Sequence, residues 1–318
     1  MKVYFFLGKG GVGKTTISAA FGTGLSKNGH KVIVVSIDPA HNLGDAFDTT
    51  LSNRELKINE NLYAVEVDIE KMTREYLDDL SKKMQHTYRY LTAMNLDRYF
   101  NILKLSPGIE EYATLEAIRK YIGSKNFDTV IFDTPPTGIT LRVLAMPRLS
   151  VLWSERLISM RKAILSRRKM VENVKGKVEA EVEGEKIVLT SDEKEDEIMQ
   201  ELIKYREEML ELNKLFSSTS CEVHIVTMAE ELALLETERI LKSLSIFSIT
   251  AKVIYLNKFM KIENPPEEIA GKIHEQEQVV TEMREKFKHL FIKEVPLLRA
   301  SPRGIRDLLS VYESYIVR

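Results

Sequence analysis

Residues 2–16 are Lys-Val-Tyr-Phe-Phe-Leu-Gly-Lys-Gly-Gly-Val-Gly-Lys-Thr-Thr, an apolar segment that runs directly into a glycine-rich loop. The loop fits the pattern G-x-x-x-x-G-K-[ST], with Gly8, Gly13, Lys14 and Thr15 at its fixed positions. Glycines let such a loop aim its N–H groups at phosphate oxygens, while the lysine reaches the β- and γ-phosphates and the hydroxyl binds Mg²⁺. The segment therefore predicts a nucleoside triphosphate site whose contacts are Gly8, Lys9, Gly10, Gly11, Val12, Gly13, Lys14, Thr15 and Thr16.

Two other apolar segments end at an aspartate. One is Thr129–Asp133, and the other is Val32–Ile37, which Asp38 follows. The carboxyl ends of parallel strands meet at one edge of a sheet, where ligands bind. We therefore expect Asp133 to hold Mg²⁺ through its water shell, and Asp38 to orient or deprotonate an attacking water. Simple capping of the loops is the alternative for either aspartate.

The order of apolar and helical segments predicts an α/β fold. The strand candidates lack alternation, as is typical of parallel strands covered on both faces. We expect a doubly wound, mostly parallel sheet forming a P-loop NTPase core from residues 1–69, 126–144 and 221–318, with residues 70–125 and 145–220 as an inserted helical subdomain. Within those insertions only Lys186–Leu189 resembles a strand. The core strands are expected at Val3–Leu7, Lys31–Ile37, Leu62–Val67, Thr129–Asp133, Glu222–Met228, Lys252–Asn257 and Ile292–Leu297.

Composition limits the partners and the compartment. The 318 residues carry 46 Lys and Arg against 47 Asp and Glu, so the net charge is −1 and no nucleic-acid partner is expected. The single cysteine, Cys221, excludes an internal disulfide and a cysteine-rich metal cluster within one chain, which fits a reducing compartment. No apolar run reaches membrane-spanning length. These features predict a cytoplasmic protein.

The second insertion contains an apolar stripe at helical spacing. The sequence leaves open whether the stripe packs on other helices or forms an adaptable hydrophobic groove. Residues 172–197, rich in Glu, Asp and Lys, are expected to form a solvated connection. The stripe consists of Leu149, Leu152, Trp153, Leu157, Met160, Ile164 and Leu165.

Three segments together resemble the arsenical pump-driving ATPase family. They are Lys9–Thr16, the run Asp-Pro-Ala-His-Asn-Leu-Gly-Asp-Ala-Phe from Asp38, and the run Asp-Thr-Pro-Pro-Thr-Gly-Ile-Thr-Leu-Arg from Asp133. The pattern is closest to the members that target tail-anchored membrane proteins. The loop itself resembles the deviant Walker A of dimeric P-loop ATPases, in which the early lysine, here Lys9, reaches the nucleotide of the partner subunit. That resemblance implies a homodimer.

The resemblance also assigns roles to individual residues. Asp38 corresponds to the catalytic carboxylate of switch I, acting with Lys9 and Lys14, and Asp133 corresponds to the aspartate of switch II. Asn257 would contact the adenine, Glu230 would contact the nucleotide, and Pro296 would lie beside the base. Ile139 departs from the family, which usually has histidine at that position.

The family implies a Mg²⁺-dependent ATPase that acts as a homodimeric switch. Its expected ligands are ATP and Mg²⁺, and its expected partners are the hydrophobic transmembrane segment of a client and a candidate membrane receptor. No Cys-x-x-Cys occurs between Asn257 and Leu290, so no zinc is expected, and Cys221 alone cannot supply three thiolates to a metalloid.

Two alternatives stay open: the ATPase subunit of an arsenite or antimonite efflux pump, and a partition or septum-positioning ATPase. The latter type binds DNA or membrane, through a basic patch or a C-terminal amphipathic helix. Here the apolar side of Ile305–Ile316 is expected to pack on the core instead of on lipid.

Overall fold

The computed structural model describes residues 1–87, 108–176, 179–182 and 185–317. It divides into two compact units. The sheet unit comprises Met1–Ile69, Thr114–Leu144 and Leu215–Arg318, and the helical unit comprises Glu70–Ala113 and Ala145–Lys214. Residues 88–107, which the sequence placed in the helical subdomain, lie outside the described residues.

The sheet unit contains an eight-stranded sheet in the order β10-β9-β8-β1-β5-β2-β4-β3. All neighbouring strands pair in parallel except β3 with β4, so the predicted α/β class and mostly parallel sheet are confirmed. The short antiparallel edge strand β3 was not predicted. The strands are β1 Lys2–Leu7, β2 Val32–Ser36, β3 Leu56–Lys57, β4 Leu62–Glu66, β5 Thr129–Asp133, β8 Cys221–Thr227, β9 Ala251–Phe259 and β10 Phe291–Pro296.

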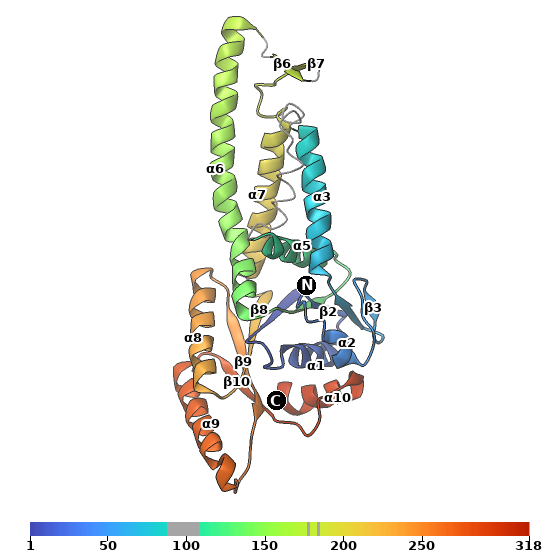
Figure 1. Cartoon of the computed structure of the whole chain (residues 1–318), viewed down its shortest axis with the longest axis vertical. Helices are drawn as coiled ribbons and strands as arrows, with labels where there is room; N and C mark the ends of the chain where they lie inside the picture. The colour runs from blue at the N-terminus through green and yellow to red at the C-terminus, as the bar shows by residue number, and fades with distance from the viewer. Residues whose placement is uncertain (88–107, 177–178, 183–184, 318) are drawn as a thin grey trace. The chain divides into compact units, whose positions relative to one another are not determined.

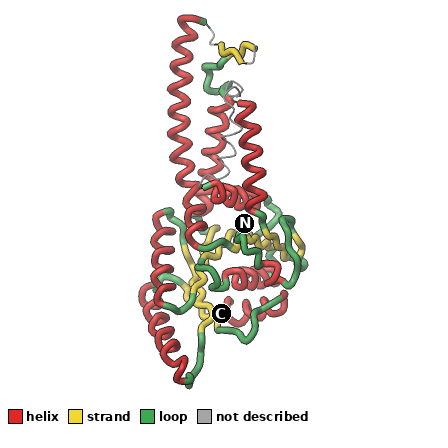
Figure 2. The backbone as a smooth tube through the Cα atoms, viewed as in Figure 1, coloured by secondary structure: helices red, strands yellow, loops and turns green. Residues whose placement is uncertain are grey.

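Helices cover the sheet. Figure 1 shows α1 (Lys14–Lys27), α2 (Leu43–Phe47) and α10 (Gly304–Val311) lying together, and a π-helical turn, η2 (Tyr312–Ile316), continues α10. The helices α8 (Glu231–Ile246) and α9 (Glu267–Lys286) accompany the strands β8 to β10 along the chain. Figure 2 shows the alternation of helix and strand that connects parallel strands in this class of fold.

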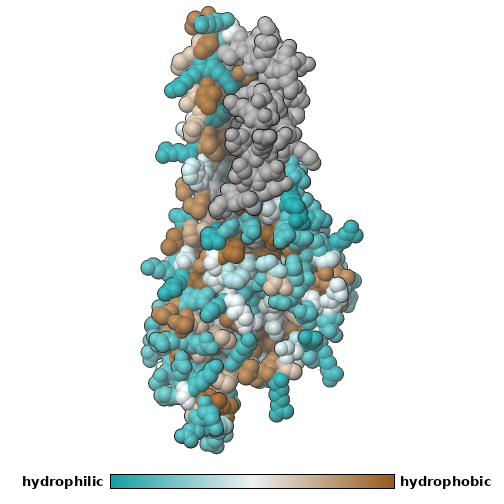
Figure 3. All heavy atoms as spheres, viewed as in Figure 1, coloured by the Kyte–Doolittle hydropathy of each residue, from teal (hydrophilic) through white to brown (hydrophobic). Residues whose placement is uncertain are grey.

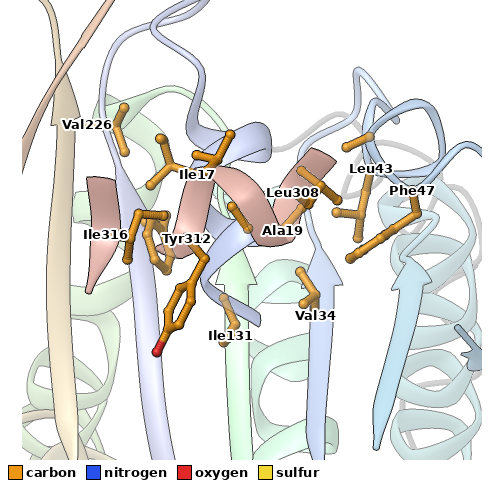
Figure 4. Close-up of a cluster of buried hydrophobic side chains, with 14 of the residues drawn as sticks. Ile17, Ala19, Val34, Leu43, Phe47, Ile131, Val226, Leu308, Tyr312 and Ile316 are labelled. Atoms are coloured by element: carbon orange, nitrogen blue, oxygen red, sulfur yellow. The ribbon is translucent and has the colours of Figure 1, made fainter. Parts of the chain in front are cut away.

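The core between α1 and the sheet depends on close helix packing. A Cβ on Gly22 would lie 2.6 Å from a methyl group of Val34, and one on Gly24 would lie 2.1 Å from the ring of Tyr312. These two positions of α1 therefore admit only glycine without rearrangement. Figure 4 shows how Leu308, Tyr312 and Ile316 enter the same buried cluster, so the expected packing of the C-terminal segment on the core is confirmed.

Aromatic side chains fill another part of the sheet core. Phe5 stacks on Phe132 at 4.9 Å between ring centroids and meets the edge of Phe216 at 5.5 Å. Phe216 ends α7 (Glu197–Phe216), and α5 (Ile109–Gly123) contributes buried side chains such as Leu115 and Tyr121. Residues 114–125 and 215–220 therefore belong to the sheet unit, and the sequence was wrong to place them in the helical subdomain. Apolar side chains of α5 and of the end of α7 are buried in the core of the sheet unit, which is why these segments belong to it.

The helical unit is built from α3 (Ile69–Thr87), the later part of α6 (Thr137–Lys175) and most of α7 (Glu197–Phe216), together with the start of α5 (Ile109–Gly123). Ile158 and Leu165 of α6 are buried against Met199 of α7. Leu165 thus lies on the side of α6 that packs inward, and its predicted membership of the apolar stripe was wrong. No helix among the described residues has both the length and the apolar content needed to cross a membrane.

One buried ion pair joins α6 to the start of α7. Arg161 donates to both carboxylate oxygens of Asp196, from Nε at 2.9 Å and from a terminal nitrogen at 2.7 Å. Asp196 also accepts the amide of Met199 at 2.8 Å, as a residue before a helix does when it caps the first turn. Between these helices, β6 (Glu179–Val182) pairs antiparallel with β7 (Glu185–Val188). The solvated connection predicted for residues 172–197 thus contains a hairpin, of which only the second strand was anticipated.

Candidate functional site

The glycine-rich loop is fixed by close contacts with neighbouring strands. A Cβ on Gly8 would lie 2.0 Å from the carbonyl oxygen of Val226 in β8. Gly13 has a φ of 96°, in the left-handed region, and a Cβ there would lie 2.2 Å from Nδ2 of Asn257. The loop therefore requires glycine at both positions because the backbone of one strand and the side chain at the end of another approach it so closely.

Lys14 begins α1 and is buried with its ammonium next to the loop. Its Nζ donates to the carbonyl oxygen of Lys9 at 3.3 Å. The positive N-terminal end of α1 adds to the charge of Lys14 at the same place. The loop thus combines a cation, a helix N-terminus and the backbone amides of a glycine-rich turn, an arrangement that binds phosphate.

Thr15 and Asp133 meet beneath the loop. Thr15 Oγ1 donates to Asp133 Oδ2 at 2.7 Å. Burial raises the pKa of the Asp133 carboxyl to about 7, although the hydroxyl of Thr15 and the nearby ammonium of Lys14 act in the opposite direction. The Asp133 carboxyl is therefore close to half ionised at neutral pH.

The same pair fits Mg²⁺. Asp133 Oδ1 is buried and has no hydrogen bond of ordinary geometry, and the same holds for Oγ of Ser36, its neighbour in the register of β2 and β5. The Ser36 hydroxyl is nevertheless close enough to lower the pKa of the Asp133 carboxyl. Mg²⁺ prefers oxygen ligands and keeps several waters, so a buried carboxylate oxygen next to a threonine hydroxyl suits a water-mediated contact. In the described residues no group of three or more His, Cys, Asp or Glu side chains forms a metal site. Triphosphate oxygens would complete the coordination sphere.

A cavity of about 440 Å³ opens above the loop. It joins the phosphate loop to the segment after β2 and to the loop before α10. Asp38 lines it together with the P-loop residues and is half-buried. The lining residues are Gly10, Gly11, Gly13, Lys14, Thr15, Thr16, Asp38, Ala40, Asn42, Asp45, Ala46, Pro136, Ser301, Pro302 and Arg303.

The segment after β2 holds Asp38 at the cavity. Asp38 Oδ1 accepts the amide of Ala40 at 3.1 Å, and His41 turns the chain with a φ of 48°. Glu66, at the end of β4, accepts the amide of Gly44 at 2.9 Å and so fixes the start of α2. Hydrogen bonds therefore stabilise the turn that carries Asp38 and the start of the helix after it. The sequence pattern did not reveal the part that Glu66 plays in stabilising this segment.

The other predicted nucleotide contacts are distributed around the same edge of the sheet. Asn257 is buried at the end of β9 and donates from Nδ2 to the carbonyl oxygen of Val12 at 2.7 Å. Pro296 ends β10, and Glu230 stands just before α8. Neither Pro296 nor Glu230 belongs to the residues that line the cavity. Asn257 does not line the cavity either, but its hydrogen bond to Val12 brings it to the loop.

Lys9 is exposed at the tip of the loop. Its carbonyl oxygen accepts Lys14, but its side chain does not line the cavity of its own chain.

Ser301, Pro302 and Arg303 line the cavity without having been predicted to do so. The sequence did contain a signal, because these residues follow the carboxyl end of β10. In a parallel sheet that end faces the same edge as the phosphate loop. Arg303 adds a second cation to the cavity and also stands at the start of α10.

The parallel sheet, the phosphate loop after β1 and the aspartate that ends β5 define a P-loop NTPase. The family model for the anion-transporting ATPases matches residues 1–316. The chain belongs to this family of ATPases, as its motifs led us to expect.

The relatives are named as ATPases. A candidate arsenical pump-driving ATPase of Aquifex aeolicus is 33% identical over 273 residues, which are 84% of this chain and 83% of the relative. The ATPase get3 of Schizosaccharomyces japonicus is 32% identical over 313 residues, covering 97% and 90% of the two chains. The ATPase get3 of Schizosaccharomyces pombe is 31% identical over 321 residues, covering 99% and 91%.

Proposed function

We propose that this protein is a Mg²⁺-dependent ATPase that works as a homodimeric switch and delivers tail-anchored membrane proteins. The observation that carries the client role is an exposed apolar stripe on α6. The nucleotide site, the position of Lys9 and the continuity of α6 support the rest of the proposal.

At the nucleotide site, the amides of the loop, Lys14 and the start of α1 bind the triphosphate and neutralise its charge. Thr15 and Asp133 would hold Mg²⁺, which supplies charge neutralisation at the transferred phosphoryl group. Asp38 reaches the cavity from its braced turn and would orient the attacking water and accept its proton. A half-buried carboxylate that shares a cavity with a phosphate loop suits that role.

The exposure of Lys9 supports action on a second subunit. A lysine whose ammonium was needed within its own site would be expected to line the cavity, as Lys14 does. Lys9, which is exposed on the loop, would pair with the phosphates of a nucleotide bound to a second copy. In a two-fold symmetric dimer each subunit then completes the site of the other. Hydrolysis would loosen this contact.

The apolar stripe extends along α6 within the helical unit. The spacing of its members along the helix places them on one side, opposite the side that packs on α7. Trp153 is 69% exposed and Val174 is 83% exposed. Figure 3 shows apolar side chains recurring along this helix. We define the apolar stripe from the structure as Leu149, Leu152, Trp153, Leu157, Met160, Ile164, Met170, Val171 and Val174.

The dimensions of the apolar stripe match a transmembrane helix. Residues 149–174 span about 37 Å at the rise of an α-helix, and a membrane-spanning helix needs about 30 Å of apolar length. Large exposed apolar surfaces on soluble proteins mark binding sites, and an apolar helix in such a surface is a recurring mode of recognition. The methionines Met160 and Met170 add adaptable side chains that suit varied clients.

A single helix connects the nucleotide site to the apolar stripe. α6 begins at Thr137, four residues after Asp133, and continues to Lys175. Thr137 Oγ1 donates to Glu236 of α8 at 3.3 Å, so the start of α6 is also tied within the sheet unit. Movement of the switch after β5 during hydrolysis would therefore act directly on the helix that binds the client.

The alternatives receive less support. Burial raises the pKa of the Cys221 thiol to about 12, so this cysteine remains protonated at neutral pH and is poorly suited to bind arsenite or antimonite. The apolar side of the C-terminal helix is buried in the core, which disfavours its use as a membrane anchor.

Co-expression with a tail-anchored client tests the proposal. The wild-type protein should yield a soluble complex that releases its client when ATP is hydrolysed. W153Q/M160Q, which makes the apolar stripe polar, should leave the client in aggregates. E155Q/K169Q, which alters exposed polar residues of the same helix outside the apolar stripe, should behave like wild type. Equal client recovery with W153Q/M160Q and wild type would refute the assigned binding surface.

A further inference from the structure

The end of β9 holds the phosphate loop through two consecutive side chains. Asn257 donates to the carbonyl oxygen of Val12 at 2.7 Å, and Lys258 donates from Nζ to the carbonyl oxygen of Gly11, also at 2.7 Å. The family resemblance implies that Asn257 contacts the adenine and implies no role for Lys258. Two neighbouring carbonyl groups of the loop are thus bound from outside by adjacent residues of one strand.

These two contacts determine where the next two amides point. In a trans peptide the C=O of one residue and the N–H of the following residue point in opposite directions in one plane. Turning the carbonyls of Gly11 and Val12 toward β9 therefore turns the amides of Val12 and Gly13 away from it. Within the described part of the chain neither amide donates a hydrogen bond. Both are available to phosphate oxygens.

The backbone at Lys258 is held in an unusual conformation. Its φ is 56°, in the left-handed region that residues with a Cβ avoid and that Gly and Asn adopt more readily. The chain is fixed directly after it, because Phe259 accepts the amide of Leu297 at 2.9 Å and Met260 exchanges two hydrogen bonds with Gln276. Position 258 is thus occupied by lysine, although its backbone conformation would favour Gly or Asn.

We propose that Lys258 is a positioning residue for nucleotide binding. Its ammonium holds the Gly11 carbonyl so that the Val12 amide is aimed at a phosphate before the nucleotide arrives, and it adds a positive charge beside the loop. Asn257 does the same for the Gly13 amide. Such preorganisation lowers the cost of binding. This inference rests on the proposed function only in requiring that the loop binds MgATP.

Substitutions at Lys258 distinguish an effect on the orientation of the phosphate loop from an effect on the stability of the fold. K258N and K258G remove the ammonium while relieving the backbone, so the nucleotide-free protein should unfold at the same or a higher temperature than wild type. MgATP binding should nevertheless weaken about tenfold, since a charge-assisted hydrogen bond that orients the loop is lost. KM should rise and kcat should change less than twofold, because loop amides bind the substrate and the transition state alike.

K258R, which keeps a cationic donor, should restore most of the affinity. K261Q removes a nearby exposed lysine with no such contact and should bind MgATP like wild type. Unchanged MgATP affinity in K258N and K258G, with wild-type binding intact, would overturn the role of Lys258 alone. A fall in unfolding temperature that parallels the loss of affinity would also overturn it. Failure of the wild-type protein to bind MgATP would overturn both this inference and the proposed function.

Discussion

Thr15 Oγ1 donates a 2.7 Å hydrogen bond to Asp133 Oδ2, which joins the start of α1 to the end of β5. The second oxygen of Asp133 is buried without a hydrogen bond of ordinary geometry, and burial raises the pKa of this carboxyl to about 7. The nucleotide-free site therefore contains a carboxylate that is costly to ionise. Mg²⁺ and its waters would supply the missing partners.

We predict that D133N stabilises the nucleotide-free protein at pH 8. The pKa of Asp133 is higher in the folded state than in the unfolded chain, so ionisation destabilises the fold increasingly as pH rises from about 4 to 7 and fully above 7. Each unit of pKa shift corresponds to about 1.4 kcal/mol. Thermal unfolding at pH 8 should show a higher midpoint for D133N and no change for D79N, which alters an exposed aspartate of α3. A lower midpoint for D133N would contradict this account of Asp133.

Binding of MgATP should release a proton from the same carboxyl. MgATP is already ionised near neutral pH, whereas Asp133 must lose its proton to accept a water of the Mg²⁺ shell. With a pKa of about 7, the release should be close to one proton at pH 6, about half a proton at pH 7, and nearly none at pH 8.5. Calorimetry in buffers of different ionisation enthalpy measures this number. Release that does not vary across this pH range would show that Asp133 is not the group responsible.

The ion pair between Arg161 and Asp196 should stabilise the helical unit. Burial alone would raise the pKa of Asp196, but the hydrogen bonds from Arg161 and from the amide of Met199 outweigh burial and lower it. The pair is therefore stabilising at neutral pH, and the stabilisation is lost as pH falls below the ordinary range of an aspartate. D196A removes both a buried charge partner and a helix cap, at a cost of about 3 kcal/mol.

Hydrogen exchange of α6 and α7 measures that cost. D196A should speed exchange in the first turn of α7. E193A breaks an exposed pair in which Lys162 and Glu193 lie 3.5 Å apart, and it should change exchange little. Equal effects of the two variants would contradict the importance of burial for the Arg161–Asp196 pair.

His224 should make the sheet unit sensitive to acid. Burial among aromatic rings lowers its pKa, an effect that Glu222 opposes and Lys293 reinforces. Because the unfolded chain takes up the proton first, the stability that depends on neutral His224 is lost as pH falls from about 6.5 through the lower folded pKa. H224F keeps an aromatic ring there and should lose less stability between pH 7 and pH 5. H289Q, which changes an exposed histidine, should lose as much stability as wild type over this pH range. An equal loss in H224F would show that His224 does not cause the acid sensitivity.

Much of the fold could be predicted because its local signals agree. The strand before Gly8, the strands ending at Asp38 and Asp133, and the helix after the phosphate loop all follow from apolar runs and loop chemistry. The edge strand β3 was missed because its two residues are exposed and carry no periodic signal. The boundary at residues 114–125 was misplaced because a helix that covers a sheet has the same pattern as one in a helical subdomain.

The site was harder to predict than the motif. Glu66 and Lys258 make hydrogen bonds to residues far away in the sequence, and no spacing along the chain reveals such contacts. Arg303 could have been inferred only from its place after the carboxyl end of β10. Leu165 illustrates the same limit on α6, since both sides of that helix are apolar. Only the packing of α7 shows which side is buried and which side forms the apolar stripe.

Mixing two inactive variants tests the central claim most directly. K9A lacks the lysine proposed to act on the partner, and D38N lacks the catalytic carboxylate, so each homodimer should hydrolyse ATP far more slowly than wild type. In a mixed dimer, the K9A subunit keeps Asp38 and receives Lys9 from the D38N subunit, which completes one site. Random reassociation should therefore restore about a quarter of wild-type phosphate release, since half of the dimers are mixed and each has one complete site. A mixture no more active than the two variants measured separately would contradict hydrolysis shared between two subunits.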